Sequence, residues 1–148
     1  MTRDEVAAIV EAALTRLVRY DYQLLDLKVC ERALQFRIAH YMAQSRLIRR
    51  PLTLDCEYNR HWDEEKLLWL FGNPRASKVF PDILIHERNT DANNMVALEI
   101  KRPDQSLHRD REKLRAFRNQ LMYPHVGHII IGHNRQGQLV REVRWVDG

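Results

Sequence analysis

Two short apolar stretches separated by a polar turn constrain the fold of this 148-residue chain more than any other feature. They run from Asp82 to Glu87 (DILIHE) and from Met95 to Lys101 (MVALEIK), and the segment RNTDANN between them is rich in turn-forming residues. Alternating runs of this length, joined by such a turn, predict a β-hairpin. A hairpin fixes which side chains share a face, because the side-chain period of a strand is two.

The register of this hairpin decides whether two acids meet. Asp82 begins the first strand, and Glu99 and Lys101 lie on one face of the second. Antiparallel partners have a constant sum of residue numbers, and a turn centred near Thr90 or Asp91 gives a sum of about 181. That register sets Asp82 opposite Glu99 on a shared face, whereas an even sum would separate the two carboxylates.

Paired carboxylates in a half-buried position require a cation. Like charges oppose each other's ionisation, so the pair is costly unless a positive charge lies beside it. Hard divalent ions such as Mg²⁺ or Mn²⁺ take carboxylate oxygens as ligands. Lys101 follows Glu99 by two residues and is expected to point to the same site, where its ammonium would stabilise developing negative charge or orient and activate a metal-bound water. We therefore expect Asp82 and Glu99 to bind Mg²⁺ or Mn²⁺ as a cofactor.

The rest of the chain follows from hydrophobic periodicity, and Thr2 with Glu5 forms a capping box at the first helix. The predicted helices cover residues 3–19, 29–46 and 106–121. The predicted strands outside the hairpin cover residues 52–59, 128–132 and 139–146. Residues 60–79 are expected to form a partly helical insertion, because three aromatic side chains lie there beside Gly, Asn and Pro.

These elements predict one α/β domain over residues 1–148, with a mixed central sheet flanked by helices. Its order is α-α-β-β-β-α-β-β, with residues 1–26 as an N-terminal helical extension and residues 60–79 as an insertion. An apolar share of 45% over this length is enough for a sizeable core. No internal repeat or domain boundary is visible.

The dipeptide Pro81-Asp82 and the triplet Glu99-Ile100-Lys101 resemble the motifs of the PD-(D/E)xK nuclease superfamily, whose fold is called restriction-endonuclease-like. The stretches CERALQFRIAHYM, DCEYNR and DREKLRAF are similar to small uncharacterised bacterial members. The resemblance covers residues 29–133 and implies a core of a helix, three antiparallel strands, a helix and a fourth strand.

The resemblance also implies roles for individual residues. Asp82 and Glu99 would be metal ligands, Lys101 the catalytic lysine, and Glu31 a further acid supplied by the first core helix. Glu31 also has a plain structural explanation, since an acid in a helix's first turn is favoured by the dipole alone. The implied activity is a metal-dependent deoxyribonuclease that hydrolyses phosphodiester bonds, and DNA is preferred over RNA by the resemblance alone.

Three further residues are weaker candidates for this site. The family often has a Gln or Tyr near the end of the helix after its ExK triplet, and Gln120 and Tyr123 occupy such positions here. Glu57 shares a strand face with Asp55, so it could supply another metal ligand. The simpler reading, which we favour, makes both acids exposed charges at the edge of the sheet.

The charge balance is compatible with an anionic partner, since the net charge is +4 and the pI about 9.3. Candidate phosphate contacts cluster around the helix after the triplet, at Arg102, Arg109, Arg111, Arg115 and Arg118. Asp110 and Glu112 within this cluster also fit ordinary pairing on a solvated helix. Trp62 and Trp69 either stack on unpaired bases or pack beneath the insertion.

Other classes find less support. Cys30 and Cys56 form no CxxC pair, His125, His128 and His133 match no zinc motif, and no apolar run reaches the ~18 residues of a membrane span. We expect a cytoplasmic protein. Two alternatives to a nuclease remain: a catalytically inactive nuclease-fold module that binds nucleic acid or protein, and a structural partner in a homodimer or larger complex that docks through the helix at 3–19.

Overall fold

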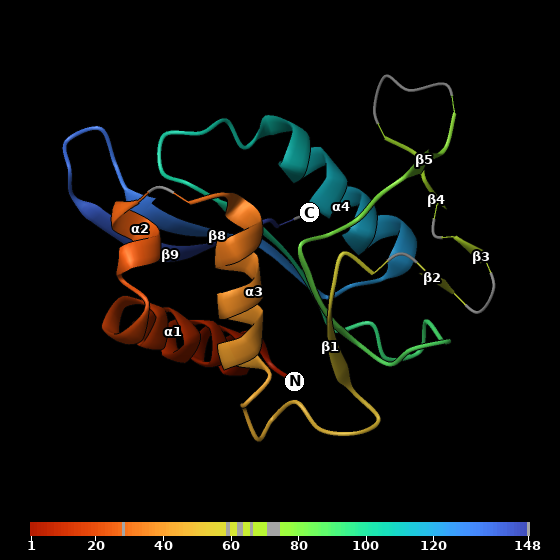
Figure 1. The fold of residues 1–148 in the computed structure, drawn as a ribbon. Coiled ribbons are helices and arrows are strands. Elements are labelled where there is room, and N and C mark those ends of the chain that lie inside the picture. Colours follow the sequence, from red (N-terminus) through yellow and green to blue (C-terminus); the bar gives the residue numbers. More distant parts are fainter. Residues whose placement is uncertain (28, 59, 62–63, 66, 71–74, 148) are drawn as a thin grey trace.

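A mixed five-stranded sheet forms the centre of the computed structural model, which describes residues 1–27, 29–58, 60–61, 64–65, 67–70 and 75–147 (Figure 1). Its strands are β1 (Thr53–Cys56), β6 (Ile83–His86), β7 (Val96–Lys101), β8 (His125–His133) and β9 (Leu139–Trp145). They lie in the order β1-β6-β7-β8-β9. β7 and β8 are parallel, and the other neighbouring pairs are antiparallel. The predicted α/β class with a mixed sheet is confirmed.

Helices cover both faces of this sheet. They are α1 (Arg3–Tyr20), α2 (Gln23–Asp26), α3 (Glu31–Met42) and α4 (His108–Leu121). α1 and α3 pack against each other on one side, and α4 lies on the other side, against β7 and β8 (Figure 1). Among the described residues, no helix is both long and apolar enough to cross a membrane.

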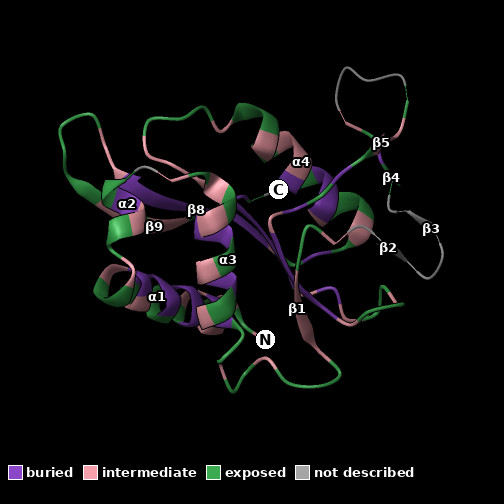
Figure 2. Cartoon of the chain, in the orientation of Figure 1, coloured by how far each residue is buried: buried purple, intermediate pink, exposed green. Residues whose placement is uncertain are grey.

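The alternation of side chains along the strands divides the interior into two cores, and buried residues line both faces of the sheet (Figure 2). The core beneath α1 and α3 includes Val96, Leu98 and Ile100 of β7. The core beneath α4 includes Ala97 of β7 and Leu84 of β6. Glu99 and Lys101 therefore project towards α4, as their spacing from Ala97 requires.

The first helix begins where its capping box predicts. The Glu5 amide donates to Thr2 Oγ1 at 3.2 Å, and the Thr2 amide donates to Glu5 Oε2 at 2.7 Å. These reciprocal bonds satisfy two amides that would otherwise lack partners at the helix start. The buried face of α1 packs on α3 and β9.

The predicted hairpin register is confirmed. Ile83 pairs with Leu98, Leu84 with Ala97, and Ile85 with Val96, so each pair of residue numbers sums to 181. The reason is burial: a slip of one residue would move the apolar set of β7 away from α1 and α3.

The largest differences between predicted and observed boundaries concern three elements. α3 covers Glu31–Met42 instead of 29–46, because Cys30 is an extended N-cap and the chain turns after Ala43. β1 ends at Cys56, because Glu57 has a positive φ of 49° that breaks the strand. β8 begins three residues earlier than predicted, at His125, where its parallel pairing with Val96 starts.

The prediction of a partly helical insertion at 60–79 is wrong for its described residues. They form two short antiparallel ribbons, β2 (Arg60–His61) with β3 (Glu64–Glu65) and β4 (Leu67–Leu68) with β5 (Ser77–Lys78). Leu68 is fully buried beside Leu67 and Trp69, which are 50% and 61% exposed, so this segment alternates with a strand's period. Trp62 lies outside the described residues.

Leu98→Ala should lower the free energy of unfolding by about 2–5 kcal/mol, because Leu98 is fully buried under α1 and α3 and its truncation leaves a cavity. Urea denaturation measures this loss. Leu27→Ala is the matched control, since Leu27 is 75% exposed, and its effect should stay below about 0.5 kcal/mol. Equal effects of the two substitutions would contradict the assignment of the core.

Candidate functional site

The hairpin brings Asp82 and Glu99 together. Asp82 directly precedes β6, and continuing the register by one residue sets it opposite Glu99 on β7. Asp82 Oδ2 accepts a hydrogen bond from the Ile100 amide at 2.6 Å, and Gln35 Nε2 on α3 donates to the Asp82 carbonyl at 2.6 Å. The position of Asp82 is therefore fixed by both its neighbouring strand and the helix in front of it.

Burial makes both carboxyl groups hard to ionise. Glu99 is 3% exposed, and burial followed by the charge of Asp82 raises its pKa to about 8, against the opposing effect of Lys113. Burial likewise raises the pKa of Asp82, outweighing its bond to the Ile100 amide and the nearby Lys113 and Lys101. A cation held between the two groups would stabilise their charged forms.

Two lysine–acid pairs connect β7 to α4. Lys113 Nζ lies 2.7 Å from Glu99 Oε1, although the two are not aligned as a hydrogen bond, and it also donates to the Phe80 carbonyl at 3.2 Å. Lys101 Nζ lies 3.1 Å from Asp110 Oδ2. Sequence reasoning did not assign Lys113 to the site, although its spacing of three from Asp110 places both on one side of α4.

Lys101 is a cation in this arrangement. Burial lowers its pKa, but the hydrogen bond to Asp110 and the charge of Asp110 outweigh burial, so the pKa of Lys101 is raised. A lysine with a raised pKa is a poor proton acceptor near neutral pH. It is better suited to orienting a water molecule or stabilising negative charge than to removing a proton.

Glu31 is electrostatically linked to this site. It is the first residue of α3, and its charge raises the pKa of both Asp82 and Lys101. The structure thus brings Asp82, Glu99 and Lys101 together on one face, and Glu31 acts on them through its charge.

The side chains of Asp55 on β1 and of Glu57 just after it pair with residues outside the acid pair, although the Glu57 amide donates to the Pro81 carbonyl at 3.1 Å. Glu57 is exposed and pairs with Arg32 at 3.6 Å. The interpretation of Asp55 as an exposed charge is wrong, because its side chain is 11% exposed. Its Oδ2 lies 3.0 Å from His86 Nε2 and 2.8 Å from Arg88 Nε. Burial raises the pKa of Asp55, but these two partners outweigh burial and hold it well below its ordinary value.

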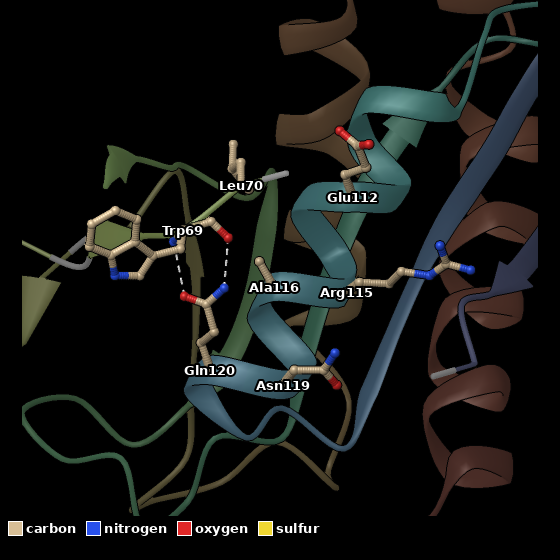
Figure 3. Close-up of a pocket in the computed structure, with 7 residues that line it drawn as sticks. All are labelled: Trp69, Leu70, Glu112, Arg115, Ala116, Asn119 and Gln120. Atoms are coloured by element: carbon tan, nitrogen blue, oxygen red, sulfur yellow. Dashed lines mark hydrogen bonds between the residues drawn. The ribbon is translucent and has the colours of Figure 1, made fainter. Parts of the chain in front are cut away.

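Gln120 and Tyr123 lie at the far end of α4 from the acid pair. Gln120 is seven residues beyond Lys113, about 10 Å along the helix. Its side-chain amide makes two hydrogen bonds with the Trp69 backbone, accepting from the Trp69 N–H at 2.9 Å and donating to the Trp69 carbonyl at 2.7 Å (Figure 3). This contact lines a surface hollow of about 490 Å³. Tyr123 is fully buried against Phe117, with ring centroids 5.5 Å apart.

The five candidate arginines separate into two groups. Arg102 donates to the Val29 carbonyl, and Arg118 donates to the carbonyls of Pro124 and Val146 at 3.4 and 3.3 Å, so these two hold the chain together. The other three are exposed on α4 and open to an anionic partner: Arg109, Arg111 and Arg115.

His128 is a neighbour of the site that sequence reasoning did not assign to it. It pairs with Glu99 across β7 and β8 and is 1% exposed. Its Nε2 is buried without a hydrogen-bond partner among the described residues, and burial lowers the pKa of its imidazole to about 4. A neutral imidazole thus lies beside Glu99 near pH 7.

The donor set suits a hard divalent ion that keeps water or substrate ligands. Mg²⁺ is commonly held by one or two carboxylates together with phosphate oxygens, and Asp82 and Glu99 provide that number. Within the described ranges, no three Cys, His, Asp or Glu side chains are grouped closely enough to hold a metal ion by themselves.

Comparison with known proteins adds no assignment: no family model matches the sequence, and no curated protein or solved structure is significantly similar to it. What this site does must therefore be inferred from its own residues.

The raised pKa of Glu99 predicts a pH-dependent stability. Between its ordinary pKa of 4.5 and about 8, the folded protein binds a proton that the unfolded chain has lost, so rising pH destabilises the fold. Glu99→Gln removes this titration. In EDTA, the melting temperature of the variant relative to wild type should therefore increase from pH 5 to pH 8.

Leu98→Ala serves as the control for that series, because it destabilises the core without removing a titratable group. The difference in melting temperature between Leu98→Ala and wild type should stay constant over the same pH range. Parallel curves for Glu99→Gln and wild type would contradict the raised pKa.

Proposed function

We propose that this protein is a divalent-metal-dependent nuclease that hydrolyses phosphodiester bonds in DNA. The observation that carries the proposal is the register of β6 and β7, which sets Asp82 opposite Glu99 with Lys101 on the same face. The series α3, β1, β6, β7, α4 and β8 follows the order of the restriction-endonuclease-like core, and we include that fold in the proposal.

Asp82 and Glu99 would hold Mg²⁺ or Mn²⁺, with Glu31 completing the set directly or through water. The ion would supply Lewis-acid polarisation of the scissile phosphate. Lys101 places a fixed positive charge on the same face, where it stabilises the additional negative charge of the transition state and orients the attacking water. Its raised pKa favours these roles over proton removal.

The exposed arginines of α4 would contact the DNA backbone. Arg109, Arg111 and Arg115 lie on the helix that carries Asp110 and Lys113, so a strand bound along α4 would pass close to the acid pair. Contacts of this type add affinity but carry no sequence information.

One observation favours a second candidate, a nuclease-fold module that binds DNA without cutting it. Glu99 and Lys101 already have partners of opposite sign on α4, Lys113 and Asp110, in the structure. A site that stays in this paired state would bind nucleic acid through α4 and have no turnover.

The proposal predicts that Asp82→Asn and Lys101→Met each lower cleavage of DNA by at least about 100-fold. Supercoiled plasmid, linear duplex and single-stranded DNA should be tested with Mg²⁺ or Mn²⁺, with EDTA abolishing cleavage. Asp82 loses its metal-ligating charge, and Lys101 loses the charge that faces the phosphate.

Glu87→Gln is the matched control for Asp82→Asn, since Glu87 follows the opposite end of β6 and accepts a hydrogen bond from Asn93 Nδ2 at 2.6 Å. It should retain wild-type cleavage. Cleavage that survives Asp82→Asn would refute the assigned site, and an absence of cleavage by wild type with every substrate and metal would favour the binding module.

A further inference from the structure

We propose that Lys113 is a built-in cation that occupies the place of a divalent metal beside Glu99, and that it sets the metal affinity of the site by competing for that place. This inference rests on the proposed metal-dependent function and adds a regulatory element to it. The competing group belongs to α4, while the metal ligands belong to the hairpin.

The contacts of Lys113 are those of a small cation among oxygen ligands. Its ammonium lies 2.7 Å from Glu99 Oε1 and 3.2 Å from the Phe80 carbonyl oxygen. Phe80 precedes Pro81 and Asp82, so the ammonium bridges the segment that leads into β6 and the middle of β7. Carboxylate and carbonyl oxygens are also the ligands that hard divalent ions prefer.

The pair is shielded from solvent, which makes the competition strong. The side chains of Glu99 and Lys113 are 4% and 19% exposed. In such a site a charge interaction is screened far less than at the surface, and one uncompensated charge is costly. Once ionised, Glu99 thus requires a cation beside it, and a metal ion and an ammonium in adjacent positions would repel each other.

Lys101 cannot readily replace Lys113, because it is already paired with Asp110. The four residues form a closed set in which β7 carries Glu99 and Lys101, and α4 carries their partners Lys113 and Asp110. A divalent ion that binds Glu99 must displace Lys113 alone. Since metal and ammonium exclude each other, removal of the ammonium must strengthen metal binding.

Isothermal titration of the full chain with Mn²⁺ tests this competition. Lys113→Gln should bind Mn²⁺ at least 10-fold more tightly than wild type, because Glu99 is then free to accept the ion. Lys113→Arg keeps a cation at the position and should stay within threefold of wild type. Arg115→Gln removes an exposed charge from the same helix, and it should change the affinity less than twofold.

A second measurement tests the inference even if Lys113→Gln makes the fold less stable. If the variant melts at a lower temperature in EDTA, saturating Mn²⁺ should raise its melting temperature by more than it raises that of wild type. A larger shift supports the inference, and an equal or smaller shift counts against it.

The outcomes separate this inference from the proposed function. If wild type binds Mn²⁺ and Lys113→Gln binds it no more tightly, or no more than Arg115→Gln does, the competition is refuted while the metal site remains. Equal tightening by Lys113→Arg and Lys113→Gln would also refute it. If no variant binds Mn²⁺, including Lys113→Gln, the metal-dependent function is refuted as well.

Discussion

The structure depends on a carboxylate that is almost fully buried next to another acid. Burial and the charge of Asp82 raise the pKa of Glu99 to about 8, and Lys113, the cation against it in this structure, offsets them only in part. The contact also ties α4 to β7, alongside the pair of Lys101 and Asp110. α4 therefore has two roles. It covers the apolar residues on this face of the sheet, and it supplies Lys113 and Asp110 as partners for Glu99 and Lys101.

The hairpin shows what sequence reasoning can establish. The turn centred near Thr90 or Asp91 predicted the sum of 181 that sets Asp82 opposite Glu99, and the structure has that register. The alternation of Val96, Leu98 and Ile100 fixes which face of β7 carries Glu99. The sequence could not predict that Lys113 is the partner of Glu99, because this contact depends on the orientation of α4 against the sheet. The same limit applies to Asp55, whose burial depends on Arg88 and His86 closing over it.

Local conformation explains the other differences. Apolar and polar residues alternate through residues 52–59, which predicts a longer strand. The positive φ of Glu57 ends β1 earlier, and the Glu57 side chain pairs with Arg32. In the insertion, aromatic side chains beside Gly, Asn and Pro predict a partly helical segment, whereas Leu68 packs into the core with a strand's period between two exposed neighbours. The resemblance suggested Gln120 as a site residue, but its side-chain amide hydrogen-bonds to the backbone of Trp69 instead.

The central claim is that the place beside Glu99 is a cation site shared between Lys113 and a divalent ion. Anomalous diffraction at the manganese absorption edge, from crystals of the protein soaked in Mn²⁺, locates the ion directly. The proposed site predicts one strong peak between the carboxylates of Asp82 and Glu99, with the Lys113 ammonium moved away from Glu99. A peak at other residues, or no peak with Lys113 still against Glu99, would contradict it.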